Sequence, residues 1–377
     1  MPKASTNLKP PANVHASRVT RLRSLLTLAE LDHLLITNPL DVAYLTGFLG
    51  GDSYLVVSKS ASKPILISDS RYQEEVAPHA AQCKIVIRKA AMSAAVIDLA
   101  ASLNGRLGFQ AEVMTVADAN SYSAAFKKAR VSIKLVPAPN LLTKLRVVKD
   151  ALEIGHIKAA VKIQEKSLLA ILKKAKAGRT EQEIAARLEA EMQTRGSREA
   201  SFHSIVAAAA NSSRPHYTPN HTKLVKNDLL LIDWGAVVEG YHSDMTRTFA
   251  LGKWPKKMKE VYKVVREAHD MAAAALAPGK RTFDIDAIAR NHIKAAGFGD
   301  YFGHGLGHGI GLNIHEEPRV SYMAGDTVLT AGHVVTIEPG IYLPGVGGVR
   351  LENDFAITEK GSECLCSLPM DLDWATL

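Results

Sequence analysis

Two aspartates lie in neighbouring apolar runs near the middle of the chain, in the segment DLLLIDWGAVVEGYHSDMTRTFAL. If Glu239 and Gly240 form a two-residue hairpin loop, counting back pairs Gly235 with Asp244. Asp233 and Asp244 then share one face as diagonal neighbours, because side chains alternate between the faces of a strand. Two buried carboxylates this close would repel each other, and a cation between them is the simplest remedy. For this pair alone, exposure on a polar sheet face is an equally open alternative.

Three histidines follow in the glycine-dense segment FGHGLGHGIGLNIHEEP, at His304, His308 and His315. Glycine lets the backbone approach a ligand closely and adopt turns that other residues avoid, so the segment is typical of a binding loop. A single histidine would mean little. Three histidines in such a segment favour a functional site over a random surface loop.

Two glutamates repeat the arrangement of the aspartates in the segment VVTIEPGIYLPGVGGVRLENDFAI. Glu338 ends one β-branched run, and Glu352 lies in the next run, across a turn rich in proline and glycine. Their even separation lets both side chains share a face if the pairing register is even. A single glutamate is more often a surface residue than a ligand, but the apolar neighbours Ile337 and Leu351 favour burial.

Four carboxylates and one imidazole make up the whole set of candidate metal ligands: Asp233, Asp244, His308, Glu338 and Glu352. This mostly oxygen environment carries too much negative charge for one divalent cation, so two cations fit better. Two cations roughly 3.5 to 4 Å apart would bridge and deprotonate a water molecule and polarise a carbonyl group, which predicts metal-assisted hydrolysis. Oxygen ligands favour manganese, with cobalt or zinc able to substitute.

The elements that would position these residues follow from the periodicity of the C-terminal two-thirds. Residues 142–176 are almost continuously compatible with a helix. A second helix is predicted to begin at Thr180, because Thr180 and Glu183 have the spacing of a capping box. Helical blocks over 255–276 and 283–296 separate two β-rich halves. Helices segregated from antiparallel-looking strands indicate an α+β architecture.

Residues 18–141 are predicted to form a smaller α/β domain. An amphipathic helix over 18–31 precedes four short apolar runs, HLLIT, YLVVS, PILIS and KIVIRK, which turn residues and charges separate. The pattern ends at the segment VPAPN. Residues 1–17 are predicted to be a disordered lead, and residues 142–377 to form the catalytic domain.

The composition excludes several classes of protein. No apolar run is long enough to span a bilayer, and no apolar segment follows Lys3 and Lys9 as a secretory signal would require. The net charge of +8 is spread along the chain without a nucleic-acid-binding motif, so it indicates a solvated basic surface. Three cysteines are too few for a disulfide framework, which favours a reducing, cytoplasmic location.

At the candidate ligands the chain resembles the pita-bread metallopeptidases, the family of Xaa-Pro aminopeptidases, prolidases and methionine aminopeptidases. The ligands occur in order within the segments LIDWGA, HSDMTRT, GLGHGIGLNIHEEP, TIEPGIY and VRLEND. Upstream, SFHSIVAAAANSSRPHY is also similar to the family, and TNPLDVAYLTGF and SDSRY resemble the N-terminal domain of its proline-specific branch. The resemblance implies a C-terminal pita-bread (creatinase/aminopeptidase) catalytic domain preceded by a smaller α/β creatinase-like domain.

The resemblance also implies a role for each candidate ligand. Asp233 would hold one metal ion, and His308 and Glu338 the other. Asp244 and Glu352 would bridge both ions, and Glu338 would also carry a proton during catalysis.

Four further residues match positions that line the substrate site in the family. His216, His304 and His315 would surround the substrate, with His315 stabilising the tetrahedral intermediate and His304 contacting the substrate. Arg350 matches an arginine that supports a ligand or contacts the substrate. Proline-containing peptides are therefore the expected substrates, and the expected assembly is a homodimer with no nucleic-acid or membrane partner.

Two residues depart from the family pattern. Asn227 replaces a glycine before the first aspartate, and asparagine tolerates the same left-handed turn conformation. Trp234 is bulkier than the usual residue, and we expect it to pack beneath the site.

We expect a dinuclear-metal exopeptidase that cleaves the Xaa-Pro bond at the N-terminus of peptides, an Xaa-Pro aminopeptidase. The alternative is prolidase, which accepts only the Xaa-Pro dipeptide. The shared ligands cannot separate the two, and the preference rests on the YLTGF and SDSRY segments, which look slightly closer to short bacterial aminopeptidases. A methionine aminopeptidase would lack the first domain. A metal-free creatinase-like hydrolase or a non-catalytic binding module would be expected to lack part of the ligand set.

Overall fold

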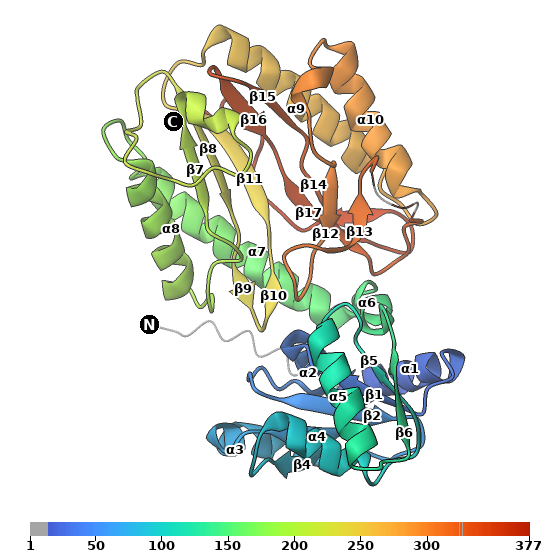
Figure 1. Cartoon of the computed structure of the whole chain (residues 1–377). Coiled ribbons are helices and arrows are strands. Elements are labelled where there is room, and N and C mark those ends of the chain that lie inside the picture. The colour runs from blue at the N-terminus through green and yellow to red at the C-terminus, as the bar shows by residue number, and fades with distance from the viewer. Residues whose placement is uncertain (1–13, 324, 326) are drawn as a thin grey trace. The chain divides into compact units, whose positions relative to one another are not determined.

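The computed structural model describes residues 14–323, 325 and 327–377, which form two compact units, 14–146 and 147–377 (Figure 1). The boundary lies a few residues beyond the predicted one, because helix α6 (Leu141–Arg146) belongs to the first unit. Its last residue, Arg146, donates to the buried carboxylate of Asp41 at 2.9 Å. Residues 1–13 of the predicted disordered lead lie outside the described residues, whereas 14–17 belong to helix α1.

The N-terminal unit is built on a six-stranded mixed sheet in the order β4-β3-β2-β1-β5-β6. Leu35, Val56 and Ile67 on its strands pack against Val96 and Phe126 on two helices. The predicted helix and the four predicted apolar strands are confirmed. The strands are β1 (His33–Ile36), β2 (Tyr54–Ser58), β3 (Ile65–Ser68), β4 (Lys84–Ile87), β5 (Gly105–Phe109) and β6 (Ile133–Pro137). The remaining α-helices are α1 (Val14–Leu28), α2 (Pro39–Thr46), α3 (Gln73–Val76), α4 (Met92–Ala100) and α5 (Val116–Lys128).

The C-terminal unit contains the helices α7 (Ala151–Leu172), α8 (Glu181–Thr194), α9 (Lys256–Ala274) and α10 (Thr282–Ala295). Helix α8 begins with the predicted capping box of Thr180 and Glu183. The single helix predicted over 142–176 is instead broken between α6 and α7. The break follows from Asp150, whose side chain caps the N-terminus of α7 and forms a second capping box with Glu153.

The strands of this unit are antiparallel, as predicted. One sheet has the order β11-β8-β7 and another the order β13-β12-β14-β17-β18, with β9–β10 and β15–β16 as separate pairs. The bounds are β7 (Ile205–Ala208), β8 (Leu229–Trp234), β9 (Val237–Val238), β10 (Tyr241–His242), β11 (Met245–Ala250), β12 (Gly307–Gly309), β13 (Glu316–Val320), β14 (Val334–Ile337), β15 (Gly340–Leu343), β16 (Gly347–Arg350), β17 (Asn353–Ile357) and β18 (Ser362–Cys364).

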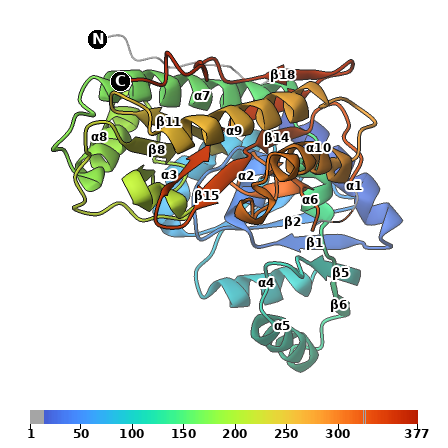
Figure 2. The same ribbon diagram turned by 90° about the horizontal axis from the view of Figure 1, so that it is seen from above.

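Helices flank these strands. In the view of Figure 1 the strands lie between α7 and α9, and Figure 2 shows the axes of these two helices lying nearly parallel. Helix α7 contacts β9 and β10, and α9 contacts β14, β15 and β16. Among the described residues, no helix is both long and apolar enough to cross a membrane.

Both departures from the family pattern have the expected structural effect. Asn227 has a φ of +63°, in the left-handed region where a glycine would otherwise be favoured. Trp234 is fully buried, and its ring N–H donates to the backbone oxygen of Gln164 on α7 at 3.0 Å. Because Trp234 follows Asp233 in β8, its ring lies on the opposite face of the strand and packs beneath the site, as predicted.

Candidate metal centre

The first hairpin places the two aspartates on one face. Glu239 and Gly240 form its two-residue loop, with φ values of +51° and +81°, the conformation of a type I′ turn. The same register continues into β8 and β11, where Asp233 pairs with Thr246. Asp244 precedes β11 and is therefore a diagonal neighbour of Asp233. The predicted geometry of this hairpin is confirmed.

The second hairpin places the two glutamates opposite each other. Ile337 pairs with Asn353 in β14–β17, and Gly340 pairs with Arg350 in β15–β16. Both pairs obey one register, in which Glu338 and Glu352 face each other between the two ladders. The segment between the glutamates was predicted to be a turn. It is a further pair of strands, which the alternating residues of GIYL and GGVR allow.

His308 lies in β12, beside the second hairpin. Its backbone N–H donates to the Thr336 hydroxyl at 3.1 Å, and its ring Nδ1 lies 3.0 Å from the backbone oxygen of Gly309. The other ring nitrogen, Nε2, is thereby directed at two carboxylates. It lies 3.6 Å from Oδ2 of Asp244 and 3.5 Å from Oε1 of Glu338.

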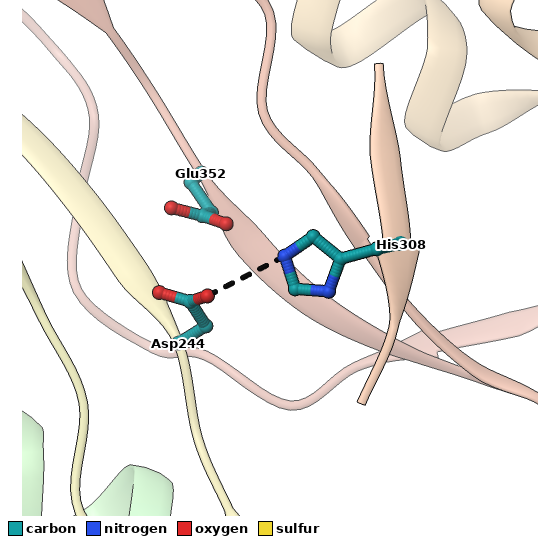
Figure 3. A group of neighbouring side chains, drawn as sticks. All are labelled: Asp244, His308 and Glu352. Atoms are coloured by element: carbon teal, nitrogen blue, oxygen red, sulfur yellow. Dashed lines mark ion pairs between the residues drawn. The ribbon is translucent and has the colours of Figure 1, made fainter. Parts of the chain in front are cut away.

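Three of the candidate ligands converge most closely. One potential ligand atom from each of Asp244, His308 and Glu352 lies within 4.8 Å of the other two, and all three residues are buried. Figure 3 shows these side chains pointing toward one another from three different segments. Glu338 joins them through its contact with His308. Asp233 lies beside them on the first hairpin, where its Oδ2 accepts from Arg350 at 2.5 Å.

The carboxylates carry more negative charge than their surroundings neutralise. Burial raises the pKa of Asp244 well above its ordinary value, and the nearby Glu352 and Asp233 raise it further. Burial likewise raises the pKa of Glu338 to about 8. In the described part of the chain, Oδ1 of Asp233 and Oδ1 of Asp244 are buried and have no hydrogen-bond partner. Unpartnered buried carboxylate oxygens are what divalent cations would satisfy, so the residues fit a metal site.

The histidines are suited to a metal site and its rim. Burial lowers the pKa of His308 to about 3, so that its ring is neutral at physiological pH and can act as a ligand. The ring of His315 lies edge-on to it, with 4.3 Å between the ring centroids. His216 is exposed and close enough to lower the pKa of both His304 and His315. The three predicted substrate-site histidines therefore lie near one another, and His315 also contacts the candidate ligand His308.

Arg350 and His304 are joined by a residue that the sequence analysis missed. The hydroxyl of Tyr342 accepts from Nη1 of Arg350 at 2.8 Å and lies 3.0 Å from Nε2 of His304. Tyr342 lies four residues after Glu338 in one continuous register, so strand alternation could have placed it on the ligand face.

Two more polar residues support the ligands from the same hairpins. The Thr246 hydroxyl donates to Oε2 of Glu352 at 2.6 Å and accepts from Nε of Arg350 at 2.9 Å. The buried Asp354 accepts the backbone N–H of Asp244 at 3.1 Å. Each of these residues lies two positions after a ligand, so the signal that could have found them is again the alternation of side chains.

Known proteins match nearly the whole chain. The model of metallopeptidase family M24 matches residues 155–359, and the creatinase/prolidase N-terminal domain matches residues 18–148. The solved structure of an Xaa-Pro dipeptidase from Bacillus anthracis is 35% identical, with a TM-score of 0.90 over 96% of this chain and 100% of that one. An X-Pro aminopeptidase structure from Thermotoga maritima is 33% identical, with a TM-score of 0.83 over 93% and 99%. An Xaa-Pro dipeptidase of Pyrococcus horikoshii is 38% identical over 246 residues, which are 65% of this chain and 70% of the relative.

These matches confirm the predicted fold class, an α+β chain with a C-terminal pita-bread domain behind a smaller creatinase-like domain. They also confirm the predicted class of enzyme, a metallo-exopeptidase. The chain therefore belongs to metallopeptidase family M24, in the proline-specific branch that contains the Xaa-Pro dipeptidases, or prolidases.

Proposed function

We propose that the protein is an Xaa-Pro dipeptidase, which hydrolyses the bond between the first residue and proline with the help of two divalent cations. The observation that carries this proposal is the cluster of buried carboxylates around His308, two of which keep unpartnered oxygens. The likeness to the Bacillus anthracis and Pyrococcus horikoshii dipeptidases supports the substrate class. It favours prolidase over the aminopeptidase that the sequence segments suggested.

The residues that would hold the cations are Asp233, Asp244, His308, Glu338 and Glu352. Asp244 and Glu352 come from opposite hairpins and converge with His308, and we assign the bridging role to them. Bound divalent cations supply a water nucleophile that is deprotonated near neutral pH, and they polarise the scissile carbonyl. The oxygen-rich ligand set favours manganese, with cobalt or zinc as possible substitutes.

The other polar residues would act on the substrate and its protons. We assign to Glu338 the transfer of a proton from the attacking water to the leaving proline nitrogen, the role that the resemblance to the family implies. His315 would donate to the oxygen of the tetrahedral intermediate. His304 and His216 would contact the substrate, and Arg350 would hold both Asp233 and Tyr342 in place.

The decisive experiment compares an Xaa-Pro dipeptide with the matching Xaa-Pro-Xaa tripeptide, at equal enzyme and manganese concentrations. A dipeptidase releases free proline from the dipeptide and leaves the tripeptide intact. Cleavage of the tripeptide after its first residue, with comparable kcat/KM, would instead favour the second candidate, an Xaa-Pro aminopeptidase. The likeness to the Thermotoga maritima enzyme is the observation that favours this second function. The cytoplasmic location and the homodimer stay predictions.

A further inference from the structure

An ion pair on α10 faces the loop that carries His304. Asp286 and Arg290 are one helical turn apart, and their side chains meet in a bidentate pair. Nε of Arg290 lies 2.7 Å from Oδ2 of Asp286, and Nη2 lies 2.9 Å from Oδ1. Asp286 is fully buried and the Arg290 side chain is 21% exposed. A pair at this spacing is usually a weak surface contact, but this pair is largely removed from solvent.

The same two side chains bind the backbone of residues 302–306 at alternate positions. Nη1 of Arg290 donates to the backbone oxygen of Phe302 at 3.0 Å, and Nη2 donates to that of His304 at 2.7 Å. Oδ1 of Asp286 accepts the backbone N–H of Leu306 at 3.0 Å. Among the described residues, these three backbone groups belong to no β-ladder, and the ion pair supplies their hydrogen-bond partners.

The loop in turn contacts the metal centre and the substrate side. The backbone oxygen of Leu306 accepts from the N–H of Glu338 at 2.8 Å. The ring of His304 lies 3.0 Å from the Tyr342 hydroxyl. Leu306 therefore lies between Asp286 on α10 and Glu338, a candidate ligand, with a hydrogen bond on each side.

The guanidinium of Arg290 is also held by aromatic rings. It lies 4.3 Å from the ring centroid of Phe302 and 4.0 Å from that of Tyr322. A planar group with several donors can stack on rings while it binds a carboxylate and two carbonyl oxygens. A lysine ammonium presents a point charge and cannot reproduce this set of contacts.

We propose that Asp286 and Arg290 are positioning residues for substrate recognition, which act by fixing the loop 302–306 and with it the ring of His304. This inference rests on the proposed function, in which His304 contacts the substrate. Neither residue touches the candidate ligands through its side chain. A substitution that breaks the ion pair should therefore raise KM for the substrate while the metal content of the protein stays the same.

The test compares Arg290→Met and Arg290→Lys with a matched control, Arg266→Met. Arg266 forms an i, i+4 pair of reversed order with Asp270 on the neighbouring helix α9, at 2.7 Å, and this pair lies on the surface. We expect both Arg290 variants to raise KM for an Xaa-Pro dipeptide by about tenfold or more. The reason is that a displaced His304 would contact the substrate less well, and small misplacements in an active site have large kinetic effects. Metal content should remain that of the wild type. Arg266→Met should leave both values unchanged.

A double-mutant cycle separates positioning from general stability. If Arg290 acts through His304, then Arg290→Met should change kcat/KM far less in a His304→Ala background than in the wild type. Full additivity of the two substitutions would overturn the proposal, as would unchanged KM in both Arg290 variants. If Arg290→Met does not fold, Arg290→Lys and Asp286→Asn carry the same comparison.

Hydrogen exchange keeps this inference distinct from the proposed function. The Leu306 amide should exchange faster in Arg290→Met and Asp286→Asn, whereas amides of α9 should not change. A wild-type enzyme that cleaves neither peptide would refute the proposed function, and the exchange rate at Leu306 would still test the positioning. Unchanged exchange at Leu306 in both variants would refute the positioning even if the enzyme is a prolidase.

Discussion

The guanidinium of Arg350 donates to Oδ2 of Asp233 at 2.5 Å, although the two residues are 117 positions apart in the sequence. The same guanidinium binds the hydroxyl of Tyr342 at 2.8 Å and that of Thr246 at 2.9 Å. One side chain thus links the two hairpins that carry the candidate ligands. It also supplies positive charge to a region crowded with carboxylates.

Replacing Arg350 by methionine should destabilise the metal-free protein more than the manganese-loaded protein. The change leaves the buried Asp233 without its cationic partner, and breaking a buried pair costs about 3–5 kcal/mol in the free energy of unfolding. Added manganese should recover part of that loss, because a cation at Asp233 would replace the lost charge. Urea denaturation with EDTA and with manganese measures both effects. The control is Lys257→Met, which removes an exposed pair with Glu260, and an equal loss in both variants would contradict the prediction.

Replacing Asp244 by alanine should remove bound metal and activity together. We expect close to two divalent ions per wild-type chain, since five ligands with four carboxylates suit two cations. Asp244 contributes a ligand atom to the closest group of candidates, so its loss should remove at least one ion. Elemental analysis of purified protein gives the count, with Asp270→Asn on the surface as the control. Full occupancy and activity in the Asp244 variant would end the two-metal hypothesis.

How much of this site the sequence predicts depends on the length of the turns. The turn at Glu239 and Gly240 is two residues long and has a strong signature, so the register of Asp233 and Asp244 follows from counting. The register of Glu338 and Glu352 does not, because a complete strand pair lies between them. Their even spacing permitted a shared face, but only the continuous register shows that they stand opposite each other.

Contacts between distant elements are the part that the sequence does not predict. Asp286 and Arg290 look like an ordinary surface pair on an amphipathic helix, and nothing nearby in the sequence indicates that they bind residues 302–306. The break in the helix at the junction between the units is also not predicted by the sequence, because helix propensity runs almost unbroken through residues 142–176. The break depends on the cap at Asp150 and on the burial of Arg146 against Asp41.

The stability of the protein should fall in mild acid because of His333. Burial and, to a smaller extent, repulsion from Lys149 together lower the pKa of His333 to about 4. Its ring Nδ1 lies 3.3 Å from the backbone N–H of Thr330, a contact that requires this nitrogen to be unprotonated. The contribution of the neutral His333 ring to the free energy of unfolding is therefore fully present above the ordinary pKa of 6.5. It is lost as the pH falls toward 4.

Urea denaturation at fixed EDTA concentration tests this effect between pH 7 and pH 4. His333 should change the free energy of unfolding by at most about 1.4 kcal/mol per pH unit. His333→Gln should flatten the curve relative to the wild type, whereas His221→Gln, at an exposed position, should not. Identical pH dependence in all three proteins would show that His333 titrates normally.

Adding one methyl group beside His308 should disturb the metal centre. A Cβ at Gly307 would lie 2.0 Å from the backbone oxygen of Thr336, so β12 would have to move away from β14. Gly307→Ala should therefore lower both metal occupancy and stability, the latter by about 1–3 kcal/mol, as overpacking of a tight interior usually does. Gly303→Ala is the matched control in the same segment, because a Cβ there would meet nothing within 4 Å. Since both variants add the same atoms four residues apart, equal metal affinity in the two would mean that the close packing of β12 does not position His308.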